Sequence, residues 1–192
     1  MPISVELDIK ELQERRRDIM HLLQPLSRIK SGPACDQQLI GNKAIILGAH
    51  EGGVLHSKFG DWRFATCQRD CWANYYELWI LIDSKNEKYC LDKAYLTIYR
   101  RNAARHVDEE TELLCLHCDP YEHDDGANPS AVYKRGPHLH VEAADDPIPK
   151  AHFALTVGNS VAVLASTAKL TQTLHLCIKM IRCEVLDRMD TS

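Results

Sequence analysis

Two histidines separated by one residue form the densest concentration of chemically versatile side chains in the sequence. His138 and His140 lie in the segment Gly-Pro-His-Leu-His. In an extended strand alternate side chains point to the same face, so both imidazoles would stand side by side. Paired imidazoles act as metal ligands, or as a general acid and base around a phosphate. We therefore predict catalytic roles for both residues; the alternative is a histidine pair on the solvated side of a strand.

Charged residues beside this pair suggest a negatively charged substrate. Lys134 and Arg135 lie just before the Gly-Pro step, and such side chains hold anionic oxygens. We predict that both bind substrate. Glu142 continues the strand face that carries the imidazoles and is a third candidate catalytic residue. His152 is a fourth, provided that its strand lies beside the first; otherwise it is a structural histidine.

A second group of candidate ligands lies about twenty residues earlier. Cys115 and Cys118 enclose His117, and a Cys-x-x-Cys pair followed by a His-x-His pair resembles the ligand spacing of a structural zinc site. We predict Cys115, His117 and Cys118 as metal ligands. In a continuous strand, however, Cys115 and Cys118 point to opposite faces, and Cys115 aligns with His117 instead. Buried free thiols are therefore the alternative. A thiol nucleophile with its base is disfavoured, because no third group orients the pair.

Amphipathic helices are predicted at both ends of the chain. Apolar residues recur at helical spacing over about 7–26, where Asp8 and Glu11 could form a capping box. A closing helix is expected at about 166–189, with Ser166 or the following threonine as its cap and an apolar stripe along one side.

An antiparallel sheet is predicted between the helices, over about 44–165. The clearest hairpin pairs residues 76–83 with residues 89–100 across a polar turn, and both faces of its first strand carry apolar residues. A last hairpin is expected from residue 152 to residue 165. The order helix, meander of strands, helix indicates a single α+β domain spanning 1–192, with the helices on one face of the sheet.

Three arginines and three tryptophans have ordinary structural interpretations. The run Arg15 to Arg17 could bind phosphate, but acidic neighbours favour a solvated helix face. Trp62, Trp72 and Trp79 are expected in the core rather than on a base-stacking platform.

The composition narrows the class of protein. The chain has 192 residues, of which 45% are hydrophobic and 26% charged, and a net charge of -4 argues against a protein that coats nucleic acid. No signal peptide and no apolar run of about 18 residues is found, so we expect a cytoplasmic protein without a membrane partner. The eight cysteines are expected to be reduced thiols. Phosphate-binding glycine loops, nucleophile elbows and dinucleotide fingerprints are absent from the sequence.

The last half of the chain resembles the TumE-type bacterial toxins of toxin–antitoxin systems. The resemblance rests on meander strands, then Gly-Pro-His-Leu-His, then a Pro-rich link to His152 and a closing helix. It implies a toxin directed at nucleic acid, a protein partner, and functional roles for His138, His140 and His152. The N-terminal helix, the middle segment and the cysteines depart from the pattern.

Two classes of function follow from these residues. The first is a hydrolase of the nuclease or phosphoesterase kind, which cleaves RNA or another phosphate-bearing substrate and uses the histidine pair either directly or as ligands of a divalent metal such as zinc. The second is a non-catalytic binding or accessory protein, which docks a protein partner and holds at most one structural zinc ion.

Overall fold

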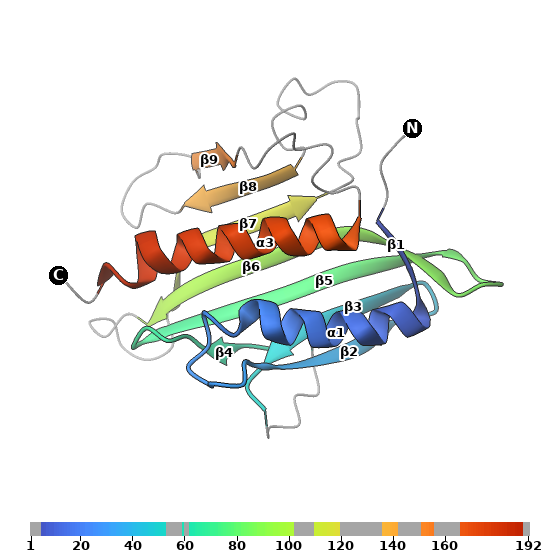
Figure 1. Ribbon diagram of the computed structural model, residues 1–192, viewed down its shortest axis with the longest axis horizontal. Helices are drawn as coiled ribbons and strands as arrows, with labels where there is room; N and C mark the ends of the chain where they lie inside the picture. Colours follow the sequence, from blue (N-terminus) through green and yellow to red (C-terminus); the bar gives the residue numbers. More distant parts are fainter. Residues whose placement is uncertain are drawn as a thin grey trace.

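One antiparallel sheet with two α-helices packed on a single face forms the part of the chain that the structure describes (Figure 1). This is the α+β architecture that the sequence predicts. The computed structural model describes residues 5–52, 59, 62–101, 110–119, 136–141, 151–155 and 166–189.

Nine strands within these ranges belong to the sheet, and all of their pairings are antiparallel. The main path runs β2-β3-β5-β6-β7-β8-β9, while β1 pairs with β6 and β4 pairs with β5. The strands are β1 (Glu6–Asp8), β2 (Ala34–Ile40), β3 (Ala44–His50), β4 (Phe64–Ala65), β5 (Cys71–Asp83), β6 (Lys88–Arg101), β7 (Glu110–Asp119), β8 (Gly136–Val141) and β9 (Ala151–Ala154).

Side-chain caps define where both helices begin. Helix α1 spans Ile9–Leu23, and Asp8 and Glu11 form the expected capping box. Helix α3 spans Thr167–Ile181 and continues as a π-helical turn, η3, over Arg182–Leu186. The Ser166 hydroxyl accepts a hydrogen bond from the backbone N–H of Lys169 at 3.3 Å, which confirms the predicted cap.

The hydrophobic core lies between the helices and one face of the sheet. Leu12, Ile19 and Leu23 of α1 are fully buried, as are Leu170 and Leu174 of α3, and all belong to one cluster of core side chains. Because side chains of a strand alternate, every second residue of β5 enters this core, whereas the residues between them are only half-buried. Both faces of this strand therefore carry apolar side chains as predicted, and the face away from the helices is the less deeply buried.

The sheet begins earlier than the predicted start at residue 44. Strand β2 is an edge strand whose alternation is weak, since its sequence contains Asp and two Gln residues and most of its side chains are exposed or half-buried. Strand β1 has only three residues. It pairs with β6, and Glu6 lies opposite Cys90. At the other end, β9 pairs with β8, and residues 156–165 of the predicted last hairpin lie outside the described residues.

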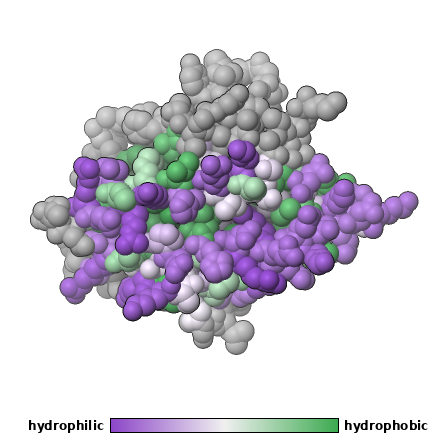
Figure 2. Space-filling model, in the orientation of Figure 1, coloured by the Kyte–Doolittle hydropathy of each residue, from purple (hydrophilic) through white to green (hydrophobic). Residues whose placement is uncertain are grey.

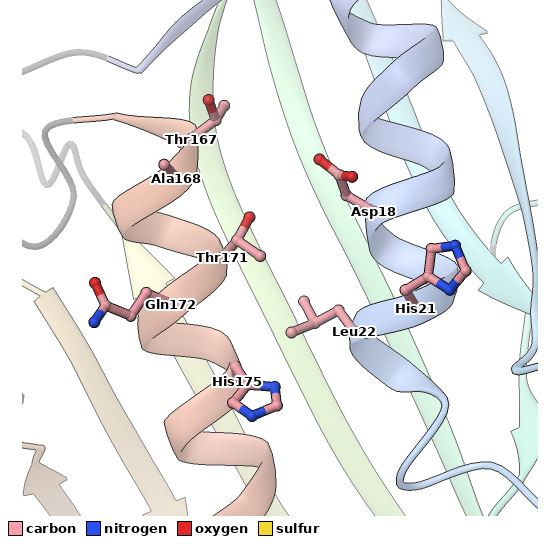
Figure 3. A pocket seen from close by; sticks show the side chains of 8 residues that line it. All are labelled: Asp18, His21, Leu22, Thr167, Ala168, Thr171, Gln172 and His175. Atoms are coloured by element: carbon pink, nitrogen blue, oxygen red, sulfur yellow. The ribbon is translucent and has the colours of Figure 1, made fainter.

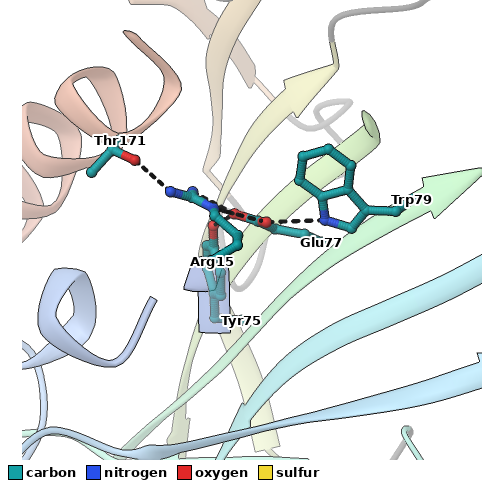
Figure 4. A network of polar contacts seen from close by, with 5 residues as sticks. All are labelled: Arg15, Tyr75, Glu77, Trp79 and Thr171. Carbon is teal, nitrogen blue, oxygen red and sulfur yellow. Dashed lines mark hydrogen bonds and ion pairs between the residues drawn. The ribbon is translucent and has the colours of Figure 1, made fainter. Parts of the chain in front are cut away.

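A buried ion pair joins α1 to the middle of the sheet (Figure 4). Arg15 is 2% exposed, and Glu77 is fully buried. Nη2 of Arg15 lies 2.6 Å from a carboxylate oxygen of Glu77. The same carboxylate accepts hydrogen bonds from the Tyr75 hydroxyl at 2.6 Å and from the Trp79 indole at 3.1 Å. Arg15 also donates to the Thr171 hydroxyl of α3, so one network connects both helices with β5.

This network corrects the prediction that the three arginines form a solvated face. Position 15 lies on the inner stripe of α1, between the buried Leu12 and Ile19, so its side chain enters the core. Burial alone would lower the pKa of Arg15, but the charge of Glu77 and its hydrogen bonds outweigh this effect and raise it. Arg16, in contrast, is half-buried and forms an ion pair with Asp36 of β2 at 2.7 Å.

The face of the molecule that carries the helices is mostly hydrophilic over α1 and over the protruding β5–β6 hairpin (Figure 2). Within the described part of the chain, no helix is long and apolar enough to cross a membrane.

Candidate functional site

Three imidazoles from two neighbouring strands converge on one face of the sheet. In the pairing of β7 with β8, His117 lies opposite His138, and Cys115 lies opposite His140. The ring of His117 stacks on that of His140 with centroids 4.0 Å apart, and His138 lies 5.1 Å from His117 and 5.0 Å from His140. One ring nitrogen of each histidine lies within 4.8 Å of the other two. We call His117, His138 and His140 the three-histidine cluster.

Strand alternation explains why the cluster faces away from the helices. Leu116 of β7 and Leu139 of β8 point toward the helices, where Leu116 is fully buried and Leu139 packs against the core. Their neighbours in sequence must then point to the opposite face. The sequence-based prediction of two imidazoles side by side agrees with this geometry, and the register adds a third.

The chemistry of such a cluster is that of a metal centre. Three imidazole nitrogens are a common ligand set of zinc, and they leave a fourth position for water or substrate. Tetrahedral zinc, with bonds of about 2.0 Å, needs ligand nitrogens roughly 3.3 Å apart, so binding requires His117 and His140 to rotate out of their stacked arrangement. His138 is 3% exposed, whereas His117 and His140 are half-buried, although Nε2 of His140 is itself buried.

The two cysteines predicted as ligands lie on different faces of the sheet. Cys118 is fully buried in the core beneath the helices, whereas Cys115 shares the face of His117. Strand β7 continues through Asp119, so the turn that a Cys-x-x-Cys site needs is not formed. This corrects the prediction of a zinc site made by Cys115, His117 and Cys118: His117 joins a cluster, and Cys118 is a core residue. The thiol of Cys115 lies 3.0 Å from the hydroxyl of Thr97.

The other predicted site residues lie at the limits of the described structure. The backbone of His152, in β9, pairs with that of His140, so its strand does lie beside the strand of the histidine pair. Lys134, Arg135 and Glu142 lie outside the described residues.

Two residues of β6, neither of which was expected from the sequence, extend the cluster. Tyr95 lies opposite His117, and its ring stacks on that imidazole at 3.9 Å with an interplanar angle of 12°. The ammonium of Lys93 lies over the Tyr95 ring, 5.6 Å from its centroid. Neither contact has a local signal in the sequence, because each depends on the register between β6 and β7.

A second region with space for a ligand lies between the two helices (Figure 3). This groove has a volume of about 620 Å³. Polar and mostly exposed side chains dominate its lining, which consists of Asp18, His21, Leu22, Thr167, Ala168, Thr171, Gln172 and His175. It lies on the helix-bearing face, so the sheet separates it from the three-histidine cluster.

Comparison of the chain with protein-family models, with curated proteins and with solved structures found no match. The resemblance to TumE-type toxins therefore stays a prediction, and the functional argument rests on the cluster itself.

Proposed function

We propose that this protein is a hydrolase of phosphodiester bonds that works with a divalent metal ion, zinc by preference, held by His117, His138 and His140. The observation that carries the proposal is the convergence of three ring nitrogens within 4.8 Å, with two of the three histidines only half-buried. The sequence supports a phosphate-bearing substrate, because Lys134 and Arg135 precede the first imidazole of β8 by only a few residues.

Each imidazole has a distinct part in this proposal. The nearly fully buried His138 would hold the ion from the buried side, and the half-buried His117 and His140 would supply the other two ring nitrogens. Zinc held there would act as a Lewis acid toward a phosphoryl oxygen and would lower the pKa of a bound water to about 7. Hydrolysis forms one bond from water oxygen to phosphorus and breaks the bond from phosphorus to the leaving alcohol, which takes up the proton of the water. No oxidant or reductant is needed.

The test uses untagged protein, because a histidine tag would itself bind zinc. Wild type and the His138→Ala/His140→Ala variant are loaded with zinc and incubated with single-stranded RNA and with a small aryl phosphodiester. We expect the double variant to lose at least about 100-fold in kcat/KM, because removal of two ligands removes the ion. A His21→Ala/His175→Ala variant, which removes two exposed histidines of the helices, is the matched control and keeps wild-type activity.

Two results contradict the proposal. One is equal hydrolysis by wild type and by the His138→Ala/His140→Ala variant, since the activity would then come from elsewhere or from a contaminant. The other is the absence of hydrolysis by fully zinc-loaded wild type on both substrates.

The competing candidate is a non-catalytic protein with a structural zinc ion, which docks a protein partner. The near-complete burial of His138 favours it, because structural zinc sites are closed. Stoichiometric zinc without hydrolysis, together with a specific copurifying partner, would select this candidate over the first.

A further inference from the structure

One cation of β6 lies beside the three-histidine cluster. Lys93 and Tyr95 are two residues apart on the same strand, so both side chains point to the sheet face of the cluster. The register confirms this face, because Lys93 lies opposite Leu78 and Tyr95 lies opposite His117. The ammonium of Lys93 is 5.6 Å from the centre of the Tyr95 ring, which stacks on His117 at 3.9 Å. These contacts place the charge within about 10 Å of the His117 ring.

The charge of Lys93 is available to a ligand. Among the described residues, none of the ion pairs involves Lys93, although a half-buried cation ordinarily gains from a carboxylate partner. The face of an aromatic ring attracts an ammonium without neutralising its charge, so Tyr95 positions the cation and leaves it able to bind an anion. A lysine ammonium is also a compact charge on a flexible stem, which suits phosphate oxygens.

The distance indicates which anion Lys93 meets. The aromatic contact of Lys93 is with Tyr95, which in turn stacks on His117, and not with an imidazole of the cluster. The charge is therefore offset from the imidazoles and suits a phosphate next to the one that the cluster would hold. A substrate with several phosphates in a row would meet both groups, whereas a small diester would meet the cluster alone.

We propose that Lys93 is a substrate-binding residue of this site, which holds a phosphate adjacent to the scissile one and so selects polyanionic phosphodiester chains. This inference rests on the proposed function, and it names the substrate as an oligonucleotide rather than a small phosphodiester.

The experiment compares two substrates for zinc-loaded wild type, Lys93→Met and Lys93→Arg: a single-stranded oligonucleotide and the small aryl phosphodiester. Lys93→Met should raise KM for the oligonucleotide about 10-fold, with kcat nearly unchanged, because a charge-assisted contact is lost from substrate binding. The slope of log KM against log salt concentration should decrease by about one, since one fewer counterion is released on binding. Lys93→Arg should restore both values, and KM for the small diester should not change in any variant.

The matched control is Lys85→Met, which removes the same charge from the exposed turn of the β5–β6 hairpin. It should match wild type on both substrates. Zinc content and the unfolding midpoint are measured for each variant, and Lys93→Gln replaces Lys93→Met should the latter not fold.

The outcomes separate this inference from the function on which it rests. Normal hydrolysis with equal oligonucleotide KM and equal salt dependence in Lys93→Met and Lys85→Met overturns the role of Lys93 alone. A KM that rises equally for both substrates overturns the assignment to a neighbouring phosphate. Absence of hydrolysis in zinc-loaded wild type overturns the proposed function, and the role of Lys93 falls with it.

Discussion

The imidazole of His117 lies between two other rings. Tyr95 stacks on one face at 3.9 Å, and His140 stacks on the other at 4.0 Å. Contacts on both faces restrict rotation about the side-chain bonds, so few orientations of the ring are open to it. A metal binds more tightly to ligands that sample few orientations than to ligands that must first be ordered. Tyr95 is therefore a positioning residue of the cluster.

Replacing Tyr95 by leucine should weaken zinc binding about 10-fold, which is the lower end of the effect of groups that orient metal ligands. Tyr95→Phe retains the stacked ring and should bind zinc as wild type does. Competition with a chromophoric chelator measures both dissociation constants. Equal affinity in Tyr95→Leu and wild type would show that the stack does not orient His117.

The cysteines differ in reactivity because they differ in burial. None of the eight, all of which lie within the described residues, forms a disulfide; Cys67 and Cys183 are exposed, and Cys35 and Cys177 are buried. Burial, with the nearby charge of Glu77 as the next cause, raises the pKa of Cys35 to about 12, and burial raises the pKa of Cys177 to about 11. At pH 8 these two thiols are almost entirely protonated in the folded protein, and the thiolate is the reactive form.

Brief alkylation of the native protein at pH 8 should therefore label Cys67 and Cys183 and leave Cys35 and Cys177 unmodified. Peptide mass spectrometry identifies the labelled positions, and the same treatment in denaturant should modify all four. Rapid native labelling of Cys35 would contradict its placement in the core.

At the scale of residues, the sequence predicts those parts of the site that depend on local geometry. The two-residue period of a strand is enough to place His138 beside His140, and it also separates Cys115 from Cys118. The third imidazole, of His117, is different: its contacts depend on which residue of β7 lies opposite which residue of β8. No pattern within one segment encodes that register, since it arises from packing of the whole sheet.

At the scale of elements, a charged group fixes how α1 lies on the sheet. The carboxylate of Glu77 accepts three hydrogen bonds from Arg15 and one each from Tyr75 and Trp79. Because the charges are almost fully buried, each depends on the other: either one alone would be an uncompensated charge in the core.

Arg15→Met should lower the free energy of unfolding by about 3–5 kcal/mol, because it leaves the Glu77 carboxylate buried without its cation. The double variant Arg15→Met/Glu77→Gln should recover a large part of this loss. Its amide is neutral: the carbonyl oxygen can accept from the Trp79 indole, and the NH2 group can donate to the Tyr75 hydroxyl. Urea unfolding followed by tryptophan fluorescence gives both values. A double variant less stable than Arg15→Met would contradict this explanation.

The helices and the central hairpin are the elements that the sequence predicts best, because their signals are local. The capping box at Asp8, the cap at Ser166 and the polar turn between β5 and β6 each lie within a few residues of the structure that they start or end. Arg15 could have been assigned to the core from its position on the apolar stripe of α1. A charged side chain is expected at the surface unless a partner for it is known. The partner of Arg15 is Glu77, which is 62 residues away and gives no local signal.

At the scale of the whole molecule, the sheet separates the hydrophobic core from the three-histidine cluster. The helices and the core occupy one face, and the three-histidine cluster occupies the other. The cluster joins β7 to β8, and both strands also contribute leucines to the core. A metal ion that bridges these strands binds only the folded chain, so its binding free energy adds to the stability of the sheet.

Zinc should accordingly raise the thermal unfolding midpoint of wild type. Free zinc at about 1,000 times the dissociation constant adds roughly 4 kcal/mol, which corresponds to about 10 °C for a chain of this size. The His138→Ala variant should show no such shift. Differential scanning calorimetry with and without a zinc buffer measures the change, and an equal shift in both proteins would indicate that the ion binds elsewhere.

The zinc content of untagged protein tests the central claim most directly. Wild type, His138→Ala and the control His175→Ala are dialysed against one zinc buffer, and the bound metal is measured by elemental analysis. The geometry predicts about one ion per chain in wild type and in His175→Ala, and almost none in His138→Ala. Equal zinc contents in wild type and His138→Ala, or no bound zinc in wild type, would contradict a metal centre at the three-histidine cluster.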